Sequence, residues 1–273
     1  MSAAAELDPT SSVLAFYATD LRRRREEAGI AQRALAKDWH MAPSLLNKIE
    51  AAKRMPNLEM SEWADDLFGS GDHFTRLFKL VIKYAYPTWF RPYVEFEEAS
   101  TFIRSFENQL VTGLLQTEDY ARAVLNAGRL SHDRVEELIV ARMERQRILD
   151  RDNRAKLWVV LDENVLRRHP GRPDVMRAQF QRLLDAADDP RTVIQVIPYS
   201  VGAHAAMAGP FAALTLDEGP DVLYVDGFVQ GQIIVDPADV KAADHAYDLL
   251  MATALSPDAS VDLIASAAKE LSR

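Results

Sequence analysis

The chain has 273 residues, 48% of them hydrophobic and 27% charged, which is the composition of a soluble globular protein with room for two domains. It contains no cysteine, which excludes a disulfide framework and a thiolate metal site. It shows neither the pattern of a signal peptide nor a run of 18 apolar residues, so we expect a cytoplasmic protein without membrane contact.

The formal net charge of −9 would oppose binding to a polyanion if it were spread evenly. Residues 1–54, however, contain nine Lys or Arg and seven Asp or Glu, a net +2, so the remaining residues carry −11. DNA responds mainly to charge within about 8 Å under cellular salt, so a local basic patch matters more than the distant total. The acidity therefore does not exclude DNA binding by the N-terminal part.

Residues 35–50, LAKDWHMAPSLLNKIE, break the periodicity of a single helix. In one continuous helix Trp39 and Met41 would lie about 200° apart and could not share a face. If the chain turns at His40, the apolar residues before and after the turn form two separate faces, and His tolerates a positive φ better than most residues. The segment predicts a helix-turn-helix whose second helix begins at Pro43, where a missing N–H does no harm.

Further amphipathic segments complete a five-helix unit. Helices are predicted at 12–29, 58–69 and 72–83, and the first of them is closed by Gly29. The sequence therefore predicts an all-α N-terminal domain over residues 1–83.

Residues 21–56 resemble the xenobiotic-response-element (XRE) class of helix-turn-helix repressors. The pattern of that class runs Leu-Arg-x-x-Arg, Gln-x-x-Leu-Ala, Ile-Glu, a short basic stretch and Pro. The matching positions are Leu21, Arg22, Arg25, Gln32, Leu35, Ala36, Ile49, Glu50, Arg54 and Pro56. The chain departs from the pattern at His40, Ala42 and Ala52, where the class prefers Gly, Ser and Gly. These departures concern the turn geometry and one helix cap, not the class.

The resemblance implies roles for two sets of residues. Phosphate contacts that set the register would come from Gln32, Arg33, Lys53 and Arg54. Contacts to base edges would come from Pro43, Ser44, Asn47 and Lys48. The chemistry agrees, because Asn can pair with an adenine edge and Lys can reach guanine acceptors. The alternative is an acidic helical scaffold on which these side chains are merely solvated, and the arginines at 22–25 fit a solvated, partly ion-paired face as well as a phosphate clamp.

Residues 84–98, YAYPTWFRPYVEFEE, form a connector too rich in aromatic residues to be a flexible linker. We expect it either to pack between the first domain and the rest of the chain or to form an ordinary core corner.

Residues 99–273 then mix helices with short strands. Strands are predicted at STFIRSFEN, AKLWVVLDE, TVIQVIPY, PFAALTLD, DVLYVDG and GQIIVD. Helices are predicted at 117–128, 131–151 and 173–189 and after the prolines at 237 and 257. Without regular βαβ alternation, this order predicts a mixed α+β domain.

This second domain resembles the C-terminal domain of actinobacterial regulators of the WhiJ type. The matching stretches are GLLQTEDYARA (113–123), RMERQ (142–146), LDENVLRR (161–168), IQVIPYSVGAH (194–204) and GPF (209–211). Thr112 stands where that family usually has Pro. The resemblance implies transcriptional regulation by a homodimer, often with a small partner protein encoded nearby. A two-fold dimer would read a palindromic operator with half-sites about 34 Å apart.

No catalytic motif is present. The chain lacks a Walker loop, a Gly-x-Ser-x-Gly elbow, a Gly-x-Gly-x-x-Gly fingerprint and a His-Glu-x-x-His pair. His204 and His245 are conceivable as a metal pair, but scattered histidines are more often surface or hydrogen-bonding residues. We therefore expect a protein that is not an enzyme and that needs neither a cofactor nor a metal.

A set of charged and polar residues in the second domain is a candidate effector or partner pocket. They are Arg142, Arg145, Gln146, Asp162, Glu163, Arg167 and His204. One interpretation is a pocket that binds an anionic effector through arginines. The other, which we favour, is a salt-bridge network that ties helix to sheet. The whole sequence predicts a dimeric, sequence-specific transcriptional regulator, and the alternative is an antitoxin-like module that binds a small partner protein.

Overall fold

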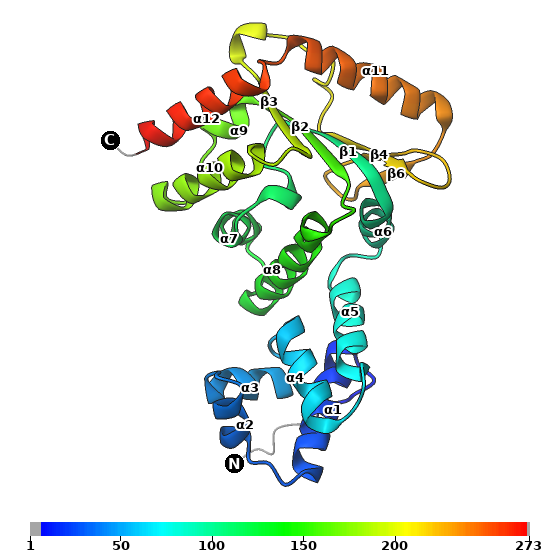
Figure 1. Ribbon diagram of the computed structural model, residues 1–273, viewed down its shortest axis with the longest axis vertical. Helices are drawn as coiled ribbons and strands as arrows, with labels where there is room; N and C mark the ends of the chain where they lie inside the picture. The colour runs from blue at the N-terminus through cyan, green and yellow to red at the C-terminus, as the bar shows by residue number, and fades with distance from the viewer. Residues whose placement is uncertain (1–6, 272–273) are drawn as a thin grey trace. The chain divides into compact units, whose positions relative to one another are not determined.

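The structure is a computed structural model that describes residues 7–271. Over this range the chain divides into two compact units (Figure 1). The first unit contains the residues up to Pro87 together with Leu130–Glu144, and the second contains Thr88–Arg129 and the residues from Arg145 onward. The boundaries predicted from the sequence, 1–83, 84–98 and 99–273, place residues 130–144 in the second domain, whereas these residues lie in the first unit.

Five helices form the described part of the first unit before Pro87. They are α1 (Val13–Glu27), α2 (Gln32–Asp38), α3 (Pro43–Glu50), α4 (Leu58–Phe68) and α5 (His73–Ala85). Their apolar faces enclose a core in which Tyr17, Leu21, Leu35, Leu46 and Phe74 are at most 1% exposed. Removing these side chains from water is the main force that holds the helices together. The predicted five-helix N-terminal domain is confirmed.

The second unit is built on a mixed sheet of six strands within the described residues. The strands are β1 (Ser100–Glu107), β2 (Lys156–Asp162), β3 (Thr192–Ile197), β4 (Phe211–Leu216), β5 (Val222–Val225) and β6 (Gln232–Ile234). Their order in the sheet is β3-β2-β1-β4-β5-β6. β1, β2 and β3 are parallel and are joined by helical crossovers, whereas β4, β5 and β6 pair antiparallel. The mixed α+β fold is as predicted. The parallel pairing of β1, β2 and β3 was not predicted, because strand pairing depends on residues far apart in the sequence.

Helices cover both faces of this sheet (Figure 1). They are α6 (Arg91–Ala99), α7 (Glu118–Ala127), α9 (Glu163–Arg167), α10 (Pro173–Ala187), α11 (Pro237–Thr253) and α12 (Pro257–Glu270), with short 3-10 helices η1 (Gly113–Leu115), η2 (Arg147–Asp150) and η3 (Tyr199–Val201). On one face the larger core includes Ile103, Leu157 and Phe180. On the other face, Tyr247 and Leu250 of α11 pack against the sheet. No helix among residues 7–271 is long and apolar enough to cross a membrane.

The boundary between the two units falls within helix α8 (His132–Gln146). Its residues up to Glu144 belong to the first unit, and its last two belong to the second. The predicted helix over 131–151 is therefore too long. The chain tightens into η2 at Arg147, as often happens where a helix ends against tertiary contacts.

The aromatic connector is part of a core and not a separate linker. Its first residues extend α5, and its later residues form α6. Trp89, Phe90 and Phe96 pack against the large core of the second unit, in which Tyr93 is itself buried. These four residues therefore form an ordinary core corner, which is one of the two expectations from the sequence.

Candidate nucleic-acid interface

The turn between α2 and α3 lies at His40, as predicted. The φ angle of His40 is +49°, in the left-handed region that favours glycine. Ala52, which follows α3, has a φ of +53° and also stands where the XRE pattern has glycine. Helix α3 begins at Pro43, and its cap Ala42 makes no side-chain hydrogen bond. The predicted reversal, the proline in the first turn and the poor cap are all confirmed.

Helix α3 has a buried side and an open side. Leu46 is fully buried and Ile49 is 3% exposed, which anchors the helix in the core of the first unit. The four residues predicted to meet base edges lie on the opposite side, and all four are exposed: Pro43, Ser44, Asn47 and Lys48. Residues three or four positions apart are neighbours on a helix surface, and the pairs 43/47, 44/47 and 44/48 therefore link these side chains into one continuous solvent-facing strip.

A buried ion pair holds helix α3 against helix α1. The guanidinium of Arg25 donates to both carboxylate oxygens of Glu50, at 2.6 and 3.0 Å, and to the carbonyl of Ile30 at 2.9 Å. The Gln32 amide donates to the same carboxylate at 2.8 Å. Gln32 is therefore oriented by Glu50, and its assigned phosphate contact, which stays a prediction, would use the other amide hydrogen.

The other predicted phosphate contacts differ in their surroundings. Arg33 and Lys53 are exposed, so they are available to a duplex. Arg54 is partly buried and forms an ion pair with Glu136 of α8. Sequence reasoning missed this contact, because no local pattern relates residues 82 positions apart. The segment that carries Glu136 was also assigned to the other domain.

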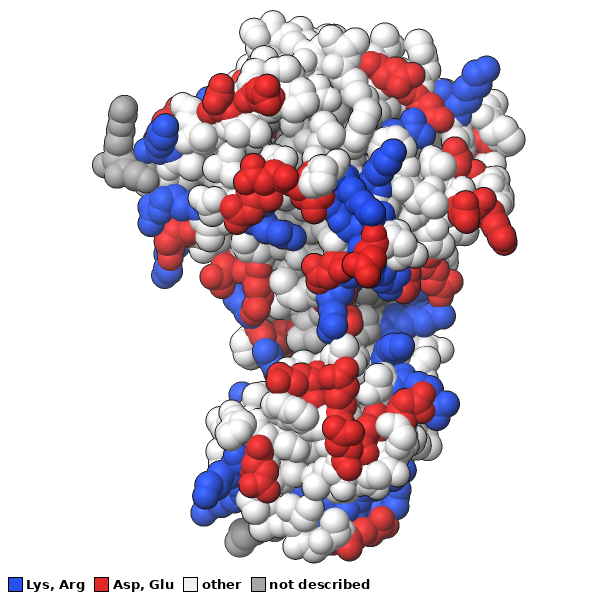
Figure 2. All heavy atoms as spheres, in the orientation of Figure 1, with Lys and Arg blue, Asp and Glu red and all other residues white. Residues whose placement is uncertain are grey.

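The arginine run on α1 is ion-paired. Arg22 pairs with Glu26, Arg23 pairs with Glu27 and Asp20, and Arg24 also pairs with Asp20. These contacts match the interpretation of a partly paired, solvated face. Figure 2 shows basic and acidic side chains interspersed over the visible face, without one continuous basic surface. On the face shown, contact with DNA would therefore depend on a few individual cations and not on an extended positive potential.

The residues predicted to form an effector pocket are divided between the two units. Arg142 belongs to the first unit, and the other six belong to the second. The Gln146 side chain donates to the carbonyls of Gly113 and Gln116, both at 2.8 Å, which ties the end of α8 to the chain before α7. The sequence did not anticipate that the boundary between the units falls within α8.

Four of the six lie at the carboxyl end of β2. Nε2 of His204 is 3.4 Å from Oδ2 of Asp162. The Arg167 guanidinium donates to Glu163 at 2.9 Å and to Glu270 of α12 at 2.9 Å. The hydrogen bond to Glu163 is the main cause of the raised pKa of Arg167. These contacts form a network of the kind that the salt-bridge interpretation describes. Among the described residues, no group of three or more His, Asp or Glu side chains is placed to hold a metal.

A polar cluster that the sequence did not reveal surrounds Arg145. Its Nε lies 3.0 Å from the buried Glu97 carboxylate. Glu107, at the end of β1, is a neighbour, and burial raises its pKa to about 8, with a further contribution from Asp226, while the hydrogen bond from Ser105 and the charge of Arg145 act against this rise. The only signal in the sequence was that Glu107 lies on the same side of a predicted strand as residues expected to be buried.

Replacing Glu107 with glutamine is expected to weaken the pH dependence of stability. With a folded pKa near 8 and an ordinary value of 4.5, this group stabilises the fold fully below about pH 4.5, and the contribution is lost as the pH rises to 8. Between pH 5 and 8.5 the free energy of unfolding of the variant should therefore fall by roughly 2–4 kcal/mol less than that of the parent. Thermal unfolding of both proteins at the two pH values measures the difference, and parallel shifts would contradict it.

The turn at a left-handed residue, the buried inner side of α3 and its open polar side define a helix-turn-helix, the fold with which many regulators bind DNA. Comparison with known families agrees: residues 17–77 match the family described as Helix-turn-helix domain. Residues 90–266, more than half of the chain, match the family described as Domain of unknown function (DUF5753). The chain therefore belongs to the DUF5753 family. No curated protein and no solved structure matches it.

Proposed function

We propose that the protein is a sequence-specific transcriptional regulator of the XRE type and the WhiJ-like group that acts as a homodimer on a palindromic operator. The helix-turn-helix reads the DNA, and the DUF5753 domain serves dimerisation and the binding of an effector or a partner protein. The protein acts by binding and not by catalysis. A dimer is needed because one small module covers too little DNA for tight specific binding.

The observation that carries this proposal is the open strip on α3. Asn47 and Lys48 are exposed there, and both have the chemistry to read bases. The opposite side of the same helix is fixed by Leu46 and by the buried pair of Glu50 with Arg25. A rigid helix with an unobstructed polar strip is what insertion into a major groove requires.

Selection of bound sequences from a randomised duplex library tests the proposal. Successive rounds with the full chain are expected to enrich an inverted repeat whose half-site centres are one or more helical turns apart. A single half-site would argue against the dimer and leave the reading of DNA in place. Failure to enrich any sequence, at low as well as physiological salt, would contradict the proposal.

Replacing Glu136 with glutamine is expected to strengthen binding to any duplex. The variant removes the charge that Arg54 pairs with, so the arginine becomes available to a phosphate. The slope of log affinity against log salt should then steepen by about 0.9 for each protomer. Titrations at several salt concentrations measure this slope, and the double variant Glu136→Gln with Arg54→Gln should lose the gain. Unchanged or weaker binding by the single variant would contradict the role assigned to Arg54.

The second candidate function is an antitoxin-like module that binds a small partner protein. The connection between β5 and β6 favours it, because Phe228 is fully exposed there and Val229 is 84% exposed. Such a module would give no enrichment in the selection experiment. Its complex with the partner would also tolerate alanine at both Asn47 and Lys48, whereas binding of a regulator to its operator would not.

A further inference from the structure

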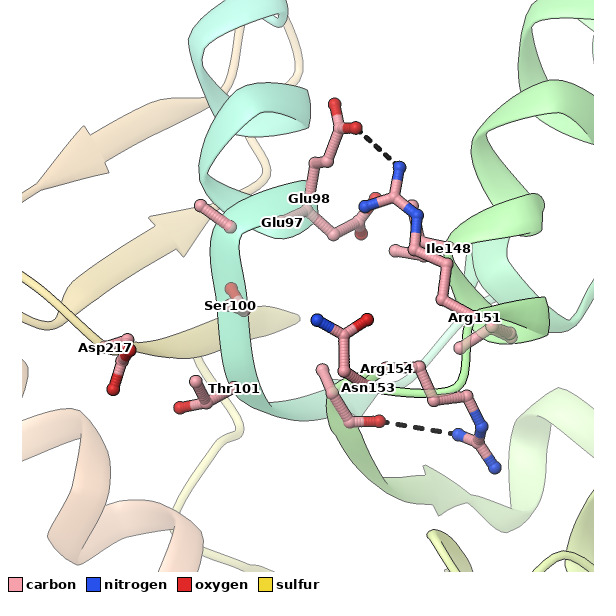
Figure 3. Close-up of a pocket in the computed structure, with 12 residues that line it drawn as sticks. Glu97, Glu98, Ser100, Thr101, Ile148, Arg151, Asn153, Arg154 and Asp217 are labelled. Atoms are coloured by element: carbon pink, nitrogen blue, oxygen red, sulfur yellow. Dashed lines mark hydrogen bonds and ion pairs between the residues drawn. The ribbon is translucent and has the colours of Figure 1, made fainter.

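The second unit contains a pocket of about 280 Å³ at the amino ends of β1 and β2 (Figure 3). It is formed where α6 passes into β1 and where η2 leads into β2, and the residue after β4 closes one side. Its charged and amide residues are Glu97, Glu98, Arg151, Asn153, Arg154 and Asp217. The volume lies just below the range of about 300–1,000 Å³ typical of pockets for drug-sized molecules, so it suits a smaller ligand.

Two of the charges in the wall are already compensated. Glu97 is 2% exposed, and its carboxylate accepts a hydrogen bond from the Tyr93 hydroxyl at 2.8 Å and lies 3.0 Å from Nε of Arg145. The side chain of Arg154 is 6% exposed and forms an ion pair with Asp189 outside the pocket. Buried charges that are paired in this way hold the wall in place and offer little to a ligand.

Three groups in the pocket remain available. The side chains of Asp217 and Asn153 have no hydrogen bond or ion pair within the described residues. Arg151 is 46% exposed and pairs with Glu98 at 2.6 Å, a single contact that leaves further N–H donors on its guanidinium. In the view of Figure 3, Asp217 and Arg151 lie on opposite sides of the pocket and the Asn153 amide lies between them.

We propose that this pocket binds a small zwitterion that carries both an ammonium and a carboxylate group, in the class of free amino acids and dipeptides. The ammonium pairs with Asp217, and the carboxylate takes the free N–H groups of Arg151, whose planar fork suits carboxylates. The Asn153 amide can donate to one end of the ligand and accept from the other. A ligand with a single charge would leave either Asp217 without a partner or the remaining N–H donors of Arg151 unused.

This inference names the effector class for the proposed function. It rests on that function only for the effect that ligand binding would have on regulation. Binding itself is measured without DNA, by isothermal titration of the full chain. The probes are the free amino acids and a set of dipeptides, each at up to about 10 mM. Failure of the protein to bind DNA would leave this measurement unaffected, and absence of ligand binding would leave the DNA selection unaffected.

Saturable binding of at least one probe is expected. Asp217→Asn and Arg151→Gln should each weaken it by about tenfold or more, because each removes a charge-assisted contact. Matched controls are Glu218→Gln, which neutralises the next acidic residue in the chain, and Arg168→Gln, which neutralises an exposed arginine outside the pocket. Both controls should bind the probe as the parent does.

Probe derivatives provide a test that requires no variant to fold. The N-acetyl and the carboxamide forms of the bound probe each lack one charge, and each should bind about tenfold more weakly or worse. The proposal is overturned if no amino acid or dipeptide binds. It is equally overturned if the singly charged derivatives bind as well as the zwitterion, or if the two pocket variants bind as well as the controls.

Discussion

Replacing both Asn47 and Lys48 with alanine is expected to abolish sequence-specific DNA binding while the fold stays intact. Each base contact is worth about 1–3 kcal/mol of discrimination, and a dimer would make four of them, so the specific affinity should fall at least about a thousandfold. Both side chains are exposed, and the hydrogen bond of Asn47 to Gln32 is long, at 3.4 Å. The cost in stability should therefore be small.

Fluorescence anisotropy with the selected operator and with a scrambled duplex of equal length measures this loss. Binding to the scrambled duplex should fall much less, because phosphate contacts supply most of it. Lys79→Ala is the matched control, since it removes an exposed positive charge from α5 in the same unit. If the double variant kept its preference for the operator, α3 would not be the reading helix.

Replacing Arg25 with methionine is expected to destabilise the first unit by about 3–5 kcal/mol. The substitution keeps most of the side-chain length but leaves the Glu50 carboxylate, which is 5% exposed, without its charged partner. It also removes the bond from the guanidinium to the Ile30 carbonyl. Breaking one side of a buried pair costs far more than the pair contributes as a whole, because the remaining charge is left in surroundings that solvate it poorly.

Hydrogen exchange of the full chain, followed at α1 and α3, measures the loss separately from the second unit. Two further variants make the result specific to the buried pair. Arg22→Met removes a neighbouring arginine whose pair with Glu26 is exposed, and it should cost no more than about 1 kcal/mol. Adding Glu50→Leu to Arg25→Met should recover much of the stability. Equal losses in Arg22→Met and Arg25→Met would contradict the assignment.

The helix-turn-helix could be predicted from the sequence because its determinants are local. The change in apolar period around His40, the proline at position 43 and the buried positions at 46 and 49 all act within one or two turns of helix. The strands of the second unit were also located correctly, since short apolar runs bounded by turn residues specify an element wherever it packs.

The contacts that could not be predicted join distant segments. The parallel pairing of β1 with β2 depends on a crossover of about fifty residues, and nothing in either strand identifies its neighbour. The pairing of Arg54 with Glu136 depends on where α8 packs within the first unit. Asp217 and Arg151 lie in irregular segments, where no period relates a residue to the space it faces.

The position of residues 130–144 has a consequence for synthesis of the chain. Small N-terminal domains commonly fold as they leave the ribosome, before later domains exist. Here the first unit takes in Leu130–Glu144, which is translated only after Thr88–Arg129 of the second unit. The partner carboxylate of Arg54 therefore does not exist when α1 to α5 emerge. A gene cut after the fifth helix would encode an incomplete first unit, so the helix-turn-helix cannot be completed without part of the segment that matches the DUF5753 family.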